Sequence, residues 1–231
     1  MEDEVAPVEP YFQTFNAAFK NIMGSSPKIT LVHTNNSYPW AHEAGVYLPD
    51  RQEFYVSSNR IKQGGSQRIQ VSKVDMKKRP YTVQEINPDI PMANGGVKYG
   101  SGVLWCAQGT SSRASGLVSM NPYPPYKTSV VISNFHGRPF SSPNDVVIGK
   151  DGGIWFTDPI YGYEQGFRPK PQLPSQVYRY DRVTKSIRAV ADGFGRPNGL
   201  AFNADQSILY VTDTDEMHGD GLKDLTRVST M

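Results

Sequence analysis

Short runs of hydrophobic residues alternate with clusters of Gly, Pro, Asn and Asp along most of this chain. The runs are rich in Val, Ile, Tyr and Phe, which is typical of short β-strands joined by turns. Helical periodicity is confined to the N-terminal part, where residues 11–22 are predicted to form a short helix or a strap. Strands are predicted at residues 29–33, 45–48, 53–57, 69–74, 103–107, 116–120, 129–132, 145–148, 154–157, 176–181, 187–191, 200–203 and 208–212. The pattern therefore predicts an all-β protein.

Four stretches of the chain repeat one another: HEAGVYLPDRQEFYVSS, NGGVKYGSGVLWCAQG, NDVVIGKDGGIWFTD and NGLAFNADQSILYVTD. Each has a polar opening residue, and the next strand is predicted to begin at an aromatic residue 11 or 12 positions later. The opening residues Glu43, Asn94, Asn144 and Asn198 are 51, 50 and 54 residues apart. A period near 50 built from short strands is typical of a β-propeller, in which equivalent strands start around a common axis. The repeat predicts a shared site at that axis.

Composition and charge narrow the range of partners and locations. The 231 residues carry a formal net charge of +2, and no basic run is longer than Lys77, Lys78 and Arg79. We therefore expect no nucleic-acid or membrane partner. The N-terminal sequence MEDEVAPVEPYFQTF has no signal-peptide pattern, no stretch has the about 18 apolar residues of a membrane span, and a cytoplasmic location is expected. The single Cys106 is expected to be buried.

One domain is expected, a single incomplete β-propeller at residues 26–231, preceded by a lead-in segment at residues 1–25. Within the β-domain, residues 159–175 form an insertion with four prolines and three aromatics. Long loops in compact β-domains are often functional, so this one is predicted to lie at the rim of the shared site. Tyr161 is its candidate substrate contact. The alternative is a proline-stiffened loop that only covers a sheet edge.

The polar opening residues suggest metal chemistry. Glu43, Asn144 and Asn198 would bring one carboxylate and two amide oxygens to the axis, and hard oxygen donors suit Ca²⁺ or Mg²⁺. The favoured cofactor is Ca²⁺, with Mg²⁺, Mn²⁺ and Zn²⁺ left open. Any single Asn could instead be a local turn residue, but the repetition in phase favours ligands. His42 is a candidate proton carrier, and a hydrogen-bonded strand histidine is the alternative.

The stretches HEAGVYLPDRQEFYVSSNR, SSPNDVVIGKDGGIWFTDPIYGYEQGFRPKPQLPSQVYRYD and ADGFGRPNGLAFNADQSILYVTDTD carry a family likeness. The chain resembles the senescence marker protein, gluconolactonase and luciferin-regenerating enzyme-like superfamily, and within it the fungal lactonohydrolases. The resemblance implies a six-bladed β-propeller with a divalent metal in its central tunnel. It implies that Glu43, Asn144 and Asn198 are metal ligands and that Asn94 contacts substrate.

The chain also departs from that family pattern. The resemblance implies a further aspartate ligand about one period after Asn198, which falls beyond Met231. Asp220 and Gly221 have matching residue types but lie only 22 residues after Asn198, so we do not assign them this role. Six blades need about 300 residues, so about four to four and a half are expected here. The chain would be a fragment, a shortened gene product or one that another chain completes, and its open edges favour self-association.

The function predicted from residues and resemblance is a metal-dependent hydrolase that opens a lactone to a hydroxy acid. Fungal relatives suggest sugar-acid metabolism or secondary metabolite biosynthesis. Ser141, Ser142 and Ser175 have no Gly-x-Ser-x-Gly context, which disfavours a serine hydrolase. Two alternatives stay open: phosphotriester hydrolysis at the same site, and a catalytically inactive binding propeller.

Overall fold

The computed structural model describes residues 12–231 and divides into two units, residues 1–36 and residues 37–231. In the first unit, helix α1 (Ala17–Met23) begins after Asn16, whose side chain accepts a hydrogen bond from the Ala18 backbone N–H at 2.9 Å. Gly24 caps the end of the helix and has a φ of 71° that favours glycine. The predicted helix overlaps α1, while its first residue, Tyr11, lies outside the described residues. No helix of the described chain is both long and apolar enough to cross a membrane.

The strand predicted at residues 29–33 is wrong. These residues adopt no regular secondary structure, and Ile29, Leu31 and Val32 are exposed. A strand needs a neighbouring strand to form a ladder, and among the described residues this segment belongs to none of the sheets. Alternating hydrophobicity was therefore not enough to make a strand here.

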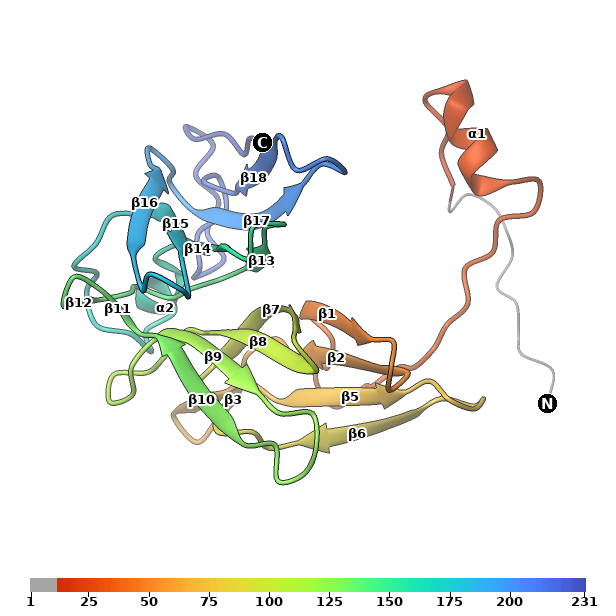
Figure 1. The fold of residues 1–231 in the computed structure, drawn as a ribbon, viewed down its shortest axis with the longest axis horizontal. Helices are drawn as coiled ribbons and strands as arrows, with labels where there is room; N and C mark the ends of the chain where they lie inside the picture. Colours follow the sequence, from red (N-terminus) through yellow and green to blue (C-terminus); the bar gives the residue numbers. More distant parts are fainter. Residues whose placement is uncertain (1–11) are drawn as a thin grey trace. The chain divides into compact units, whose positions relative to one another are not determined.

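The second unit consists of antiparallel sheets, and the prediction of an all-β fold is confirmed (Figure 1). The first sheet has the order β1 (Glu43–Leu48), β2 (Glu53–Ser57), β5 (Val71–Asp75), β6 (Thr82–Ile86). The second contains β7 (Ala93–Tyr99), β8 (Gly102–Ala107), β9 (Gly116–Met120) and β10 (Thr128–Ile132). The third contains β13 (Val146–Ile148), β14 (Ile154–Asp158), β15 (Gln176–Tyr180) and β16 (Ile187–Ala191). A two-stranded sheet follows, formed by β17 (Pro197–Phe202) and β18 (Leu209–Asp213).

Each sheet is a meander in sequence order, and the first strands of successive sheets lie beside one another. Strand β1 contacts β7, β7 contacts β13, and β13 contacts β17. Two small hairpins are added to this series: β3 (Ile61–Gln63) with β4 (Ser66–Arg68), and β11 (Asn134–Phe135) with β12 (Arg138–Pro139). The sequence did not predict these hairpins, nor β6 and β7. The number of blades in a complete ring stays a prediction.

Two hydrophobic clusters hold the sheets together. One contains Tyr55 and Trp105, which are fully buried, and joins the first two sheets. The other contains Phe140, Phe156 and Tyr178, whose rings contact one another at centroid distances of 5.1 to 5.4 Å. The aromatic residues predicted to begin strands lie instead at the second to fourth positions of β2, β8, β14 and β18. The strands start earlier because polar or small residues such as Glu53 and Gly102 extend the ladder before the aromatic residue.

The insertion at residues 159–175 is folded rather than extended. It contains helix α2 (Tyr161–Glu164), and Arg168 fixes it by donating to the backbone carbonyls of Ser141 (2.9 Å), Thr110 (2.7 Å) and Phe140 (2.9 Å). Such carbonyl contacts satisfy a guanidinium that would otherwise be costly to desolvate. The loop that carries Tyr161 is therefore anchored to the second and third sheets.

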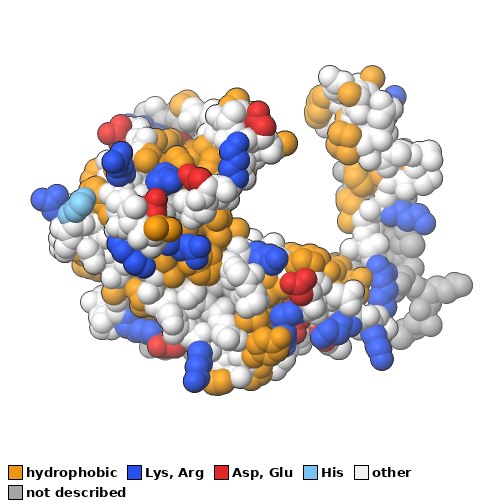
Figure 2. Space-filling model, in the orientation of Figure 1, with side chains coloured by type: hydrophobic (Ala, Val, Ile, Leu, Met, Phe, Trp, Pro, Cys, Tyr) orange, Lys and Arg blue, Asp and Glu red, His pale blue; other side chains and the backbone are white. Residues whose placement is uncertain are grey.

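On the face drawn in Figure 2, lysine and arginine side chains are dispersed among neutral ones over the sheets of residues 37–231.

Candidate functional site

The opening residues of the repeats lie at irregular starts of the first strands. The pairing of β1 with β2 shifts register between Glu43 and Val46, and β17 shows the same shift between Pro197 and Leu200. Strand β7 shifts in the same way after Ala93. A β-bulge bends the strand and re-aims the side chain at that position. Asn94 and Asn198 lie inside these irregular segments, and Glu43 is the paired residue directly before one of them.

Hydrogen bonds join these positions from one sheet to the next. The Ser57 hydroxyl donates to the Asn94 carbonyl at 2.9 Å, and the Thr157 hydroxyl donates to the Asn198 carbonyl at 2.7 Å. Between them, the Gly95 N–H donates to the Asn144 carbonyl at 2.8 Å. The residues predicted to share a site are thus consecutive neighbours along the series of first strands.

Two of the amide side chains carry buried oxygens without a partner. Asn94 Oδ1 and Asn144 Oδ1 accept no hydrogen bond from the described residues, and Asn144 is only 3% exposed. Burying a polar oxygen without a partner costs about 1–3 kcal/mol, so such atoms are uncommon unless a ligand, ion or water completes them. Both oxygens are therefore available to an additional group.

Glu43 has an unfavourable environment for a carboxylate. Burial, and then repulsion from Asp145, raise the pKa of Glu43 to about 7. Asp145 is itself held in place, because its Oδ1 accepts from the Val146 N–H (2.8 Å) and its Oδ2 from the Leu200 N–H (3.2 Å). A cation near Glu43 would relieve this repulsion. These contacts make Asp145 a brace between β13 and β17.

Asn198 lies beside the insertion loop. Its Nδ2 donates to the Tyr161 hydroxyl at 3.4 Å, and that hydroxyl also bonds the Thr214 side chain. Because the nitrogen faces Tyr161, the amide oxygen of Asn198 is left for another partner. The structure thus brings Tyr161, which was predicted from loop length alone, to a predicted ligand.

His42 lies next to Glu43, with its Nε2 3.7 Å from Glu43 Oε1. Burial, and then the charge of Arg60, lower the pKa of His42. The imidazole is therefore neutral near pH 7 and can accept a proton. Its backbone N–H donates to the Ser57 carbonyl at 2.8 Å, which fixes the residue at the start of β1.

The chemistry of these donors fits a hard cation. Among the described residues, no group of three His, Cys, Asp or Glu side chains is placed to hold a metal ion. An ion at this site would depend on the Glu43 carboxylate together with amide oxygens of Asn144 and Asn198. Oxygen donors of this kind suit Ca²⁺ or Mg²⁺ better than Zn²⁺.

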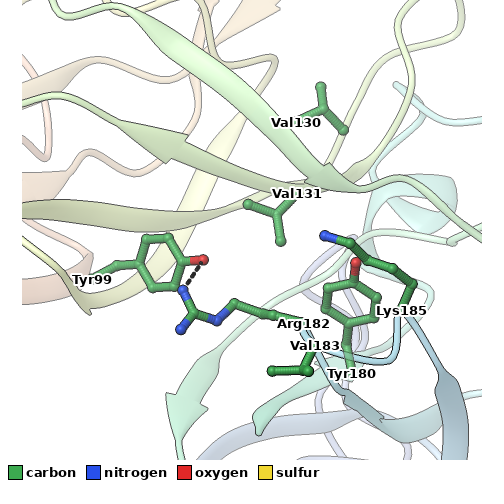
Figure 3. Close-up of a pocket in the computed structure, with 7 residues that line it drawn as sticks. All are labelled: Tyr99, Val130, Val131, Tyr180, Arg182, Val183 and Lys185. Carbon is green, nitrogen blue, oxygen red and sulfur yellow. Dashed lines mark hydrogen bonds between the residues drawn. The ribbon is translucent and has the colours of Figure 1, made fainter. Parts of the chain in front are cut away.

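A surface pocket of about 470 Å³ lies elsewhere, between the second and third sheets (Figure 3). Valines, two tyrosines and two cationic side chains line it, and Arg182 donates to the Tyr99 hydroxyl at 2.8 Å. Its lining includes no carboxylate and none of the opening residues. The pocket therefore lacks the donors of the candidate site.

Sequence reasoning missed the arginines around the site. Arg196 donates from Nε to Glu164 Oε1 at 3.1 Å and from Nη1 to Asp215 Oδ1 at 2.6 Å, and it is 8% exposed. This cluster ties α2, and with it Tyr161, to the start of β17. Arg196 stands two residues before Asn198, and this closeness to a predicted ligand was the available signal. Arg60 follows β2 and had no comparable signal.

Asp158 and Asp213, the last residues of β14 and β18, share one role. Asp158 accepts from the Ser141 and Ser142 N–H groups, each at 2.8 Å, and Asp213 accepts from Gly195 (2.9 Å) and Arg196 (2.7 Å). Each carboxylate thus fixes the backbone that leads into an opening asparagine.

The chain matches a family model described as the SMP-30/Gluconolactonase/LRE-like region over residues 68–218. Lactonohydrolase oryL of Aspergillus oryzae is 32% identical over 227 residues, covering 90% of this chain and 50% of that protein. The gluconolactonase of Zymomonas mobilis is 33% identical over 125 residues, covering 53% of this chain and 34% of that protein. The chain thus spans half or less of the length of these two relatives.

Solved structures show the same fold. A gluconolactonase from Xanthomonas campestris superposes with a TM-score of 0.61 at 24% identity, covering 80% of this chain and 58% of that one. A structure described as a putative gluconolactonase superposes with a TM-score of 0.62 at 24% identity, covering 79% of this chain and 59% of that one.

Proposed function

The chain belongs to the SMP-30/gluconolactonase/LRE-like family. From this membership we propose that it acts as a hydrolase that opens a lactone to a hydroxy acid. The names of the relatives support the substrate class, and the site supports the reaction type. We also propose that the sheets belong to a six-bladed β-propeller, in which the first strands surround a central tunnel. A role in tailoring a metabolite is proposed from the Aspergillus relative.

One observation carries the proposal. Buried, unpartnered amide oxygens of Asn94 and Asn144 occur in the same series of strand starts as the partly buried Glu43 carboxylate. Glu43, Asn144 and Asn198 would hold a divalent cation, most favourably Ca²⁺. When bound, such a cation polarises a lactone carbonyl and stabilises the oxyanion. Asn94 is left as a donor and acceptor for the substrate.

The chain's own side chains supply proton transfer and positioning. Neutral His42 can take the proton of the water whose oxygen bonds to the carbonyl carbon. As the bond between that carbon and the ring oxygen breaks, the same proton passes to the leaving alkoxide, which gives the hydroxy acid. Tyr161 is held at Asn198 and would border the bound ring.

The test combines metal binding with hydrolysis. Isothermal calorimetry with Ca²⁺, Mg²⁺ and Mn²⁺ compares the wild type, Glu43→Gln and the exposed control Asp192→Asn, and a pH-stat follows hydrolysis of a lactone panel. We expect the wild type and Asp192→Asn to bind Ca²⁺, and Glu43→Gln to lose at least about tenfold in affinity and activity. If no divalent ion binds and Glu43→Gln hydrolyses lactones like the wild type, the proposal is wrong. A phosphotriester in the panel separates the alternative substrate class.

A further inference from the structure

Arg60 lies at the end of the first sheet nearest the candidate site. It follows β2, and its Nη1 donates to Gln67 Oε1 in the β3–β4 hairpin at 3.1 Å. Its Nη2 reaches the Gly219 carbonyl, far along the chain, at 3.5 Å. The Gly219 N–H in turn donates to Glu164 Oε2 at 2.7 Å, and Glu164 belongs to α2, the helix that begins with Tyr161. The guanidinium therefore lies beside the part of the C-terminal loop that contacts the helix of Tyr161.

This guanidinium has more donors than partners. It carries five N–H groups, of which the described residues use two, one of them at the outer limit of a hydrogen bond. No carboxylate of the described residues forms an ion pair with it. Burial lowers the pKa of Arg60, which agrees with a cation that has lost water without gaining an acidic neighbour.

Comparison with two other partly buried arginines shows that this is unusual within the chain. Arg168 donates to four backbone carbonyls and the Ser115 hydroxyl, so its planar group is fully engaged as a brace. Arg196 is neutralised by Glu164 and Asp215. Arg60 has neither a full set of carbonyl acceptors nor a carboxylate partner among the described residues. Its two hydrogen bonds to Gln67 and Gly219 leave three N–H groups without a role in holding the described part of the fold.

We propose that Arg60 is the receptor for a carboxylate in the active site, supplied either by a lactone that carries an acidic group or by the hydroxy acid product. The inference rests on the proposed lactone hydrolysis and adds the chemical group that the site recognises. Paired N–H groups of a guanidinium match the two oxygens of a carboxylate, and partial burial strengthens that contact. The carboxylate comes either from the intact lactone or from ring opening, and both present the same chemistry to Arg60.

The first arm of the test measures selectivity. A lactone with a ring carboxylate and the methyl amide of the same lactone are hydrolysed by the wild type, Arg60→Gln, Arg60→Lys and the control Arg182→Gln. If the intact substrate provides the carboxylate, Arg60→Gln lowers the ratio of kcat/KM, acidic over neutral, at least about tenfold, mainly through KM. Arg60→Lys keeps the charge without the paired geometry and gives an intermediate ratio, while Arg182→Gln gives the wild-type ratio.

The second arm measures inhibition of neutral-lactone hydrolysis by its own hydroxy acid product. If ring opening provides the carboxylate, Arg60→Gln weakens this inhibition about tenfold and leaves the selectivity ratio as in the wild type. An unchanged ratio together with unchanged inhibition overturns the inference, even if hydrolysis is observed. If the wild type hydrolyses no lactone, the proposed function fails, and calorimetry with the hydroxy acid then tests Arg60 alone: equal affinity in wild type and Arg60→Gln overturns it.

Discussion

Replacing Glu43 with glutamine should stabilise the metal-free protein while removing its response to a divalent ion. The reason is the raised pKa of Glu43, about 7 in the folded chain against 4.5 for an ordinary glutamate. Between these pH values the folded chain keeps a proton that the unfolded chain releases. Stability therefore falls as pH rises from 4.5 to about 7, and the loss persists at higher pH.

The size of the effect follows from the separation of the two pKa values. It corresponds to about 3 kcal/mol if the carboxylate were fully shielded. The side chain is 28% exposed, and solvent screening reduces the expected penalty to about 2 kcal/mol. A glutamine side chain at this position carries no charge, so Glu43→Gln should unfold roughly 4–8 °C above the wild type at pH 8 in a chelator. At pH 4 the two proteins should unfold at about the same temperature.

The assay is thermal unfolding followed by circular dichroism from pH 4 to pH 8, first in EDTA and then with Ca²⁺. A ligand at one hundred times its Kd stabilises the folded state by about 2.7 kcal/mol, so Ca²⁺ should reverse the order of the two proteins. Asp192→Asn, which removes an exposed carboxylate, should follow the wild type in both series. A wild type that loses no stability relative to Glu43→Gln between pH 4.5 and 8 in EDTA would refute the reasoning.

Three further predictions concern the framework of the site. Burial opposes ionisation of Glu53, but hydrogen bonds from its cationic and tyrosine neighbours lower its pKa to about 2, so Glu53→Gln should cost about 3 kcal/mol in urea unfolding at pH 7. The deficit should shrink as pH falls from 4.5 towards 2, and a constant deficit would contradict the assigned pKa. Gly95→Ala puts a Cβ 2.4 Å from the Asn144 carbonyl oxygen, so the backbone of Asn144 must shift. Calorimetry should show weakened Ca²⁺ binding, and the free energy of unfolding should fall by about 1–3 kcal/mol. Unchanged Ca²⁺ affinity would show that this contact does not position the ion site. Arg196→Met leaves Glu164 without its ion-pair partner and should lower the free energy of unfolding by about 3–5 kcal/mol. It should also raise KM more than it lowers kcat, whereas a purely structural role would leave KM unchanged.

Local patterns in the sequence were sufficient to predict most strands of the second unit. Strands β2, β9 and β16 have the predicted bounds, and most of the others differ by one or two residues at an end. Each of these strands has alternating or continuous apolar residues flanked by Gly, Asn or Asp, so the signal lies within the strand itself. The family likeness, carried by the same segments, is confirmed by the model match over residues 68–218.

What the sequence could not predict depends on contacts between distant segments. The hairpin β3–β4 contains polar residues such as Lys62 and Gln63, which give no alternation, and residues 29–33 have alternation but join no sheet of the described chain. The bulge at Glu43 requires positive φ values at Ala44 and Gly45, and only the pairing with β2 imposes them. The ligand assignments for Glu43, Asn144 and Asn198 stay a prediction.

The serine and threonine hydroxyls that link neighbouring strand starts have a mechanical consequence. Ser57 holds the carbonyl of Asn94, and Thr157 holds that of Asn198, so each sheet sets the position of a side chain belonging to the next sheet. The candidate site therefore depends on contacts between neighbouring sheets. Local unfolding of one sheet would displace the asparagine oxygens of the next sheet. An ion shared among these strands would couple the unfolding of the sheets, so its affinity would report on how well the entire series is assembled.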